Sequence, residues 1–187
     1  RAGRFIGWYY SKAKTNKRAR ISIGKDTRRS SYMLEYSIIA GITASGGDAY
    51  MLHVTTTPSV SYITRCDEFD CGVMITASHN PFYDNGIKII NSYGEKLDDR
   101  TASLIEAYID GDDIPFAKKE NIGKIVDYTA GRNRYVGYLI SIASHSYKNL
   151  RIGLDCANGA SWSIARAVFD ALGAQLYVTG CSPDGLN

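Results

Sequence analysis

A serine and a histidine stand side by side where an apolar segment gives way to small and polar residues. The run from Thr76 to Lys88 is TASHNPFYDNGIK, and it follows the apolar residues 73–75. In open α/β sheets, ligands bind beyond the carboxyl ends of the strands, so Ser78 lies where a nucleophile is expected. Pro81 restricts the preceding residue to extended conformations, which favours a loop over the start of a helix at this point.

Two neighbours of the serine are candidates for the same site. The loop can present the His79 ring beside the Ser78 hydroxyl, and Lys88 can return from the next strand toward the same place. Taken one by one, these residues favour a plain polar turn with local hydrogen bonds between two buried strands. A hydrolase elbow is excluded, because Thr76 and Asn80 stand where the Gly-x-Ser-x-Gly pattern needs glycines.

Apolar periodicity and turn residues predict alternating strands and helices. We expect strands at residues 20–24, 50–54, 72–76, 87–90, 151–155 and 175–179, and helices at residues 2–14, 30–46, 58–65, 99–109, 130–144 and 161–172. Ser30 or Ser31 is expected to cap the second helix. This order predicts an α/β fold, a three-layer αβα domain with a mostly parallel mixed sheet and the start of a second similar domain. The polar connection at residues 110–124 places the boundary between residues 1–125 and 126–187.

Composition excludes several other classes of protein. The chain has 187 residues and a net charge of +3, which is too small to argue for nucleic-acid binding, and the basic stretch at residues 12–20 is interpreted as solvated surface. No apolar run approaches the roughly 20 residues that span a bilayer, and no signal peptide is evident, so a cytoplasmic location and no membrane contact are expected. The four cysteines form no Cys-x-x-Cys pair and are predicted to be reduced structural thiols.

The string from Thr76 to Pro81 resembles the phosphoserine loop of the α-D-phosphohexomutase superfamily. Residues 82–88 are most similar to the version found in its phosphoglucosamine mutase branch. Residues 24–28 with 31–35 resemble the family's early strand and the helix that follows. Residues 155–160 resemble the turn after the first strand of its second domain. The resemblance covers nearly the whole chain.

The resemblance implies an enzyme of four domains, of which this chain would hold the first, without its N-terminal strand, and part of the second. Ser78 would be the phosphoserine, His79 its neighbour in the active-site loop, and Lys88 a general acid/base or phosphate partner. Mg²⁺ would bind the Ser78 phosphoryl group, with further ligands from an aspartate-rich loop that this sequence lacks. The segment Asp110-Gly111-Asp112-Asp113 is interpreted as a solvated connection and not as that loop.

The implied reaction interconverts glucosamine 6-phosphate and glucosamine 1-phosphate through a 1,6-bisphosphate, in amino-sugar and cell-wall precursor synthesis. The implied activator is glucosamine 1,6-bisphosphate or glucose 1,6-bisphosphate, the partner is a phosphorylated hexosamine substrate, and a homodimer is left open. The alternatives are a phosphomannomutase or phosphoglucomutase, because the sugar-reading loop is absent, or a non-catalytic domain. The 187-residue chain alone is expected to be inactive.

Overall fold

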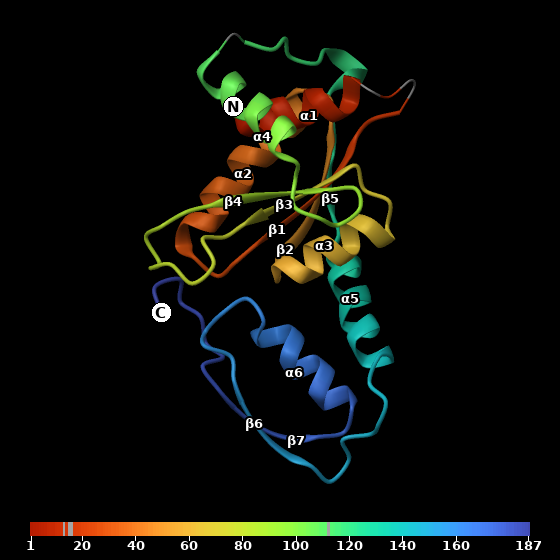
Figure 1. The fold of residues 1–187 in the computed structure, drawn as a ribbon, viewed down its shortest axis with the longest axis vertical. Coiled ribbons are helices and arrows are strands. Elements are labelled where there is room, and N and C mark those ends of the chain that lie inside the picture. Colours follow the sequence, from red (N-terminus) through yellow and green to blue (C-terminus); the bar gives the residue numbers. More distant parts are fainter. Residues whose placement is uncertain (13, 15–16, 112) are drawn as a thin grey trace.

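The computed structural model describes residues 1–12, 14, 17–111 and 113–187. A five-stranded sheet with helices on both faces forms the larger part, and a two-stranded sheet with one helix forms the smaller part (Figure 1). The predicted three-layer α/β fold is therefore confirmed. The first predicted helix, at residues 2–14, ends earlier in the structure, at Lys12, and residue 13 within it and the connecting residue 112 lie outside the described residues.

The large sheet is mixed and mostly parallel, with the order β4-β3-β1-β2-β5. Only β4 runs antiparallel to its neighbour among the strand pairs described. The short strand β5 was not predicted. The strands of this sheet are β1 (Arg20–Lys25), β2 (Asp48–Val54), β3 (Cys71–Ile75), β4 (Ile87–Asn91) and β5 (Ile125–Asp127), and the smaller sheet pairs β6 (Arg151–Asp155) in parallel with β7 (Gln175–Thr179).

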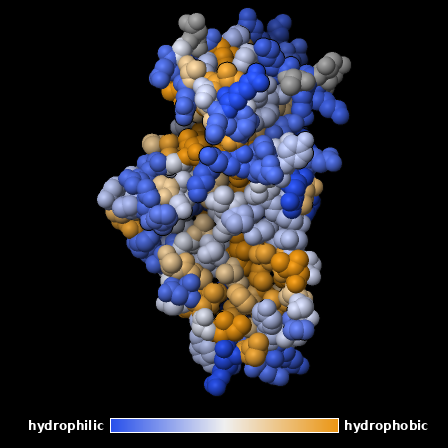
Figure 2. Space-filling model, in the orientation of Figure 1, coloured by the Kyte–Doolittle hydropathy of each residue, from blue (hydrophilic) through white to orange (hydrophobic). Residues whose placement is uncertain are grey.

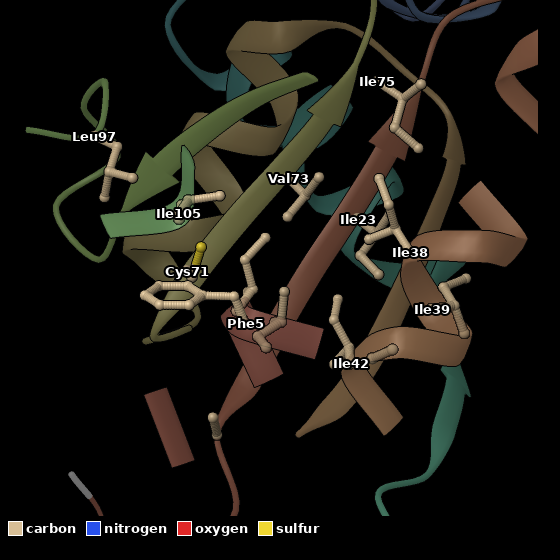
Figure 3. Packing of buried hydrophobic residues seen from close by; sticks show 14 of the residues in the cluster. Phe5, Ile23, Ile38, Ile39, Ile42, Cys71, Val73, Ile75, Leu97 and Ile105 are labelled. Atoms are coloured by element: carbon tan, nitrogen blue, oxygen red, sulfur yellow. The ribbon is translucent and has the colours of Figure 1, made fainter. Parts of the chain in front are cut away.

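Helices cover both faces of the large sheet, and a short 3₁₀ turn, η1 (Lys119–Asn121), lies in the connection before β5. The helices are α1 (Ala2–Lys12), α2 (Arg29–Ala44) and α4 (Asp99–Asp110) on one face, α3 (Thr57–Cys66) and α5 (Thr129–Ser141) on the other, and α6 (Trp162–Ala171) beside β7. The main apolar core lies between the sheet and the helices α1, α2 and α4, and in it side chains of β1 and β3 face α1 and α2 (Figure 3). α1 and α2 pack backbone to backbone: a Cβ atom added at Gly7 would lie 2.4 Å from the carbonyl oxygen of Ile42.

The start of α2 differs from the prediction. Arg28 occupies the N-cap position in an extended conformation, so Ser30 and Ser31 lie in the first helical turn and cap nothing. The Ser31 hydroxyl instead donates to Asp26 Oδ1 at 2.6 Å, a charge-assisted hydrogen bond that ties the first turn of α2 to the residue after β1. The start of α3 is as predicted, with Pro58 in its first turn.

The smaller sheet has one covered face. Alternate residues of β6 and β7 are exposed, and α6 packs on β7. Figure 2 shows apolar side chains gathered at the surface of the lower part of the molecule. Ile142, the residue after α5, is 59% exposed. β5 completes the first sheet, and α5 contacts both α3 and α6, so the boundary between residues 125 and 126 stays a prediction.

Within the described residues, no helix is long and apolar enough to cross a membrane.

Candidate active site

A cavity of about 610 Å³ lies between the two sheets, at the carboxyl ends of β1 and β3. Ser78 and His79 contribute to its wall from the loop after β3. Thr27 lies opposite the turn after β6, and its hydroxyl donates to the carbonyl oxygen of Asn158 at 3.2 Å. Both predicted loop residues therefore face the space that separates the two parts of the chain.

The remaining wall comes from the second part of the chain. Residues 157–161 follow β6, and residues 185–187 form the last turn. In that turn the backbone N–H groups of Leu186 and Asn187 donate to Asp184, and these bonds lower the pKa of its carboxyl group. The turn is thus held by its own hydrogen bonds.

The loop that follows β3 and carries Ser78, here called the serine loop (residues 76–86), passes from the buried sheet to the surface within a few residues. β3 is buried along its whole length, Thr76 is still buried, and Ser78 is exposed. The Ser78 backbone N–H donates to Thr76 Oγ1 at 3.0 Å, and Ser78 has a φ of 58°. A residue other than glycine held at positive φ costs about 1–3 kcal/mol, so the surrounding contacts must enforce this conformation.

Arg28 supplies those contacts from the turn between β1 and α2. Its guanidinium group lies under the loop and donates to the carbonyl oxygens of Ser78 at 3.1 Å, Asn80 at 2.8 Å and Asp84 at 3.1 Å, and also to that of Pro81. This role of Arg28 was not predicted from the sequence. The sequence feature that could have indicated it is that Arg28 closely follows a predicted strand. In the structure this strand, β1, lies beside β3.

The electrostatics of the cavity favour an anion. The N-terminal residues Thr56 and Thr57 of α3 and the residue before α6, Ser161, line its wall. The N-terminal end of a helix carries partial positive charge and unpaired N–H groups, which favour phosphate. The nearby acid Asp26 pairs with Arg28, which offsets its negative charge.

Lys88 is not part of this wall. It pairs with Met74 across the antiparallel β3–β4 ladder, is exposed, and lines a separate apolar cavity of about 860 Å³ with Leu97 and Ile105. Thr57 lines both cavities. The structure therefore brings Ser78 and His79 together and places Lys88 in the adjoining cavity.

The described residues do not form a magnesium site on their own. No group of three or more His, Cys, Asp or Glu side chains that could hold a metal ion occurs in the described part of the chain. Both carboxylate oxygens of Asp26 already accept hydrogen bonds. Asp113 pairs with Arg4 at 2.5 Å and lies outside the wall of the serine cavity, whereas Asp112 is outside the described residues.

The family model for the phosphoglucomutase/phosphomannomutase α/β/α domain I matches residues 1–114, which is more than half of the chain. The chain belongs to this family. Curated relatives agree: the phosphoglucosamine mutase of Lachnospira eligens is 62% identical over the whole of this chain, and that of Clostridioides difficile is 45% identical. The chain spans 42% and 41% of the lengths of these relatives.

Solved structures share the fold. A phosphoglucomutase/phosphomannomutase family protein from Burkholderia thailandensis matches 98% of this chain and 40% of its own length with a TM-score of 0.77 at 22% identity. Parafusin, a phosphoglucomutase from Paramecium, matches 99% of this chain and 40% of its own length with a TM-score of 0.66 at 20% identity. The described residues therefore share the fold of these structures, and residues 1–114 correspond to the α/β/α domain I of the family.

Proposed function

We propose that the whole protein is a phosphoglucosamine mutase and that this chain supplies its phosphoserine loop. The observation that carries the proposal is the position of Ser78, exposed at the end of a buried strand and facing an anion-favouring cavity. The identity of 62% to a phosphoglucosamine mutase over the full chain supports the choice of branch.

In the proposed reaction, Ser78 carries a phosphoryl group. A hexosamine phosphate accepts this group through its free hydroxyl and becomes a 1,6-bisphosphate, which then returns its other phosphoryl group to Ser78. Phosphoryl transfer depends mostly on alignment and on neutralising charge. The N-terminal ends of α3 and α6 supply partial positive charge at the cavity wall.

Phosphohexomutases generally depend on Mg²⁺, and Ser78 through its phosphate would be the contribution of this chain to the ion. The described residues do not complete such a site. A sugar 1,6-bisphosphate activator would restore phosphate to Ser78. His79 is proposed to contact the substrate from the same wall. The cytoplasmic location and the homodimer stay predictions.

A second candidate is a phosphomannomutase or phosphoglucomutase, favoured by the description of the matching family model. Assays of the whole protein with glucosamine, glucose and mannose phosphates separate the two candidates. We expect kcat/KM for glucosamine 6-phosphate to exceed that for the others by at least about tenfold, the discrimination that a few polar contacts provide. Faster turnover of a glucose or mannose phosphate would favour the second candidate, and no turnover of any sugar phosphate would contradict both.

The acid/base role of Lys88 has its own test. In the whole protein, Lys88→Met should lower kcat by about 10²-fold, the usual scale for a lost proton-transfer group. Lys96 lines the same apolar cavity, so Lys96→Met is the matched control and should retain kcat. An unchanged kcat with lowered stability in Lys88→Met would assign Lys88 a structural role.

A further inference from the structure

We infer that Arg28 is a positioning residue that holds the serine loop in the conformation needed for phosphoryl transfer. The inference rests on the proposed function and names a determinant of the same site that is distant from Ser78 in the sequence. Arg28 lies in the turn between β1 and α2, and its side chain reaches under the loop that follows β3.

Every donor of the Arg28 guanidinium group has an acceptor. Nη1 donates to the carbonyl oxygens of Pro81 and Asp84, and Nη2 donates to those of Ser78 and Asn80. Nε donates to Asp26 Oδ2 at 2.9 Å. A guanidinium group has five N–H donors in a fixed planar arrangement, so this set uses its full capacity. Lysine, with three donors on a point charge, cannot reproduce this pattern.

The anchor of Arg28 is itself rigid. The arginine is 8% exposed, and Asp26 beside it is also 8% exposed. Asp26 accepts from the Arg28 side chain, from the Arg28 backbone N–H at 3.1 Å and from the Ser31 hydroxyl at 2.6 Å. Asp26 directly follows β1, which has a neighbouring strand on each side, β2 and β3. Its position is therefore fixed by the interior of the sheet. Because the Arg28 side chain is held in this way, its hydrogen bonds fix the loop at a defined place relative to the sheet.

The consequence for the reaction is geometric. The four loop carbonyl groups turn inward to one guanidinium group, and Ser78 keeps its positive φ next to them. Without the guanidinium group these partly buried acceptors lose their partner, and the loop is expected to rearrange so that water can replace it. Displacing a reacting atom by about 1 Å can cost roughly 10²-fold in rate. Arg28 would therefore govern kcat without touching the sugar.

The test compares Arg28→Lys and Arg28→Ala with the wild type in the whole protein. We expect kcat for glucosamine 6-phosphate to fall by about 10²-fold in both, with KM changed by less than about threefold, because alignment and not uniform binding is lost. Lysine should fail to rescue, whereas added guanidinium ion at millimolar concentration should raise kcat of Arg28→Ala. The matched control is Arg65→Lys, an exposed arginine of α3, which should retain wild-type kcat.

Hydrogen exchange separates this inference from the proposed function. The amides of Asn80 and Asp84 are bonded within the loop, to the carbonyl oxygens of Ala77 at 3.2 Å and Pro81 at 3.0 Å. Both should exchange at least about tenfold faster in Arg28→Lys, whether or not the wild type has mutase activity, since losing a few hydrogen bonds shifts local opening by that factor. A wild type without turnover would refute the function while leaving this readout intact.

Two results would overturn the inference. Wild-type exchange of these amides in Arg28→Lys would show that the loop does not need the guanidinium group, and faster exchange with wild-type kcat would show that the reaction does not need the ordered loop. If the arginine variants fail to fold, Asp26→Asn provides a milder change, because it keeps Arg28 and removes the charge that anchors it. It should lower kcat and speed exchange in the same direction, and wild-type values for both would again overturn the inference.

Discussion

Ser78→Ala in the whole protein is expected to abolish mutase turnover, with a loss of at least about 10³-fold, and to leave the fold intact. Removing the atom that carries the transferred group eliminates the covalent route, and nucleophile deletions are among the most costly changes in enzymes. Stability should change by less than about 0.5 kcal/mol, because Ser78 is exposed and fills no core space. The measurement is a coupled assay beside a thermal melt.

A second serine provides the control for this substitution. Ser37 lies on the exposed surface of α2, where its hydroxyl donates within its own helix, to the carbonyl oxygen of Met33 at 2.8 Å. Ser37→Ala should keep full turnover. Intact mass should show one phosphoryl group in the wild type and in Ser37→Ala after incubation with a sugar bisphosphate, and none in Ser78→Ala. Near wild-type turnover of Ser78→Ala would remove Ser78 from the mechanism.

Much of the fold follows from local patterns, because the inner strands β1 and β3 are buried at almost every position and are rich in apolar residues. The run at residues 71–75 is an example, since it lies between two layers of helices and is buried at every position. β5 was missed because it is three residues long and has no such run. Its pairing depends on a distant contact, in which the Lys124 backbone N–H donates to Asp48 Oδ1 at 2.9 Å.

The candidate site is only partly visible in the sequence. The change from apolar to polar residues after β3 places Ser78 and His79 at the carboxyl edge of the sheet, and both line the cavity. The Arg28 contacts join residues 50 to 56 positions apart through backbone carbonyl groups, which side-chain patterns do not encode. Lys88 pairs with Met74, which lines the Ser78 cavity, but Lys88 itself lines the adjoining cavity, and its role beside Ser78 stays a prediction.

The 187-residue chain alone is expected to have no measurable phosphoglucosamine mutase activity, even with Mg²⁺ and a sugar bisphosphate activator. Mg²⁺ requires oxygen ligands in near-octahedral geometry, and a phosphate on Ser78 could supply about one or two of them. The described residues add no cluster of acids that could supply the rest. The chain also spans 42% of its Lachnospira eligens relative, so the unmatched parts of that relative have no counterpart in this chain to help hold the sugar in line.

The test is a coupled assay of the purified 187-residue chain beside the whole protein, with Ser78 phosphorylated to the same extent in both samples. With equal phosphorylation of Ser78, a difference in turnover reflects transition-state stabilisation and not the fraction of chains that carry a phosphoryl group. Losing that stabilisation alone should cost about 10²-fold or more. Turnover of the chain within about tenfold of the whole protein would contradict the prediction. It would mean that the unmatched parts of the relatives are dispensable, or that acids such as Asp110 and Asp113 bind the ion after all.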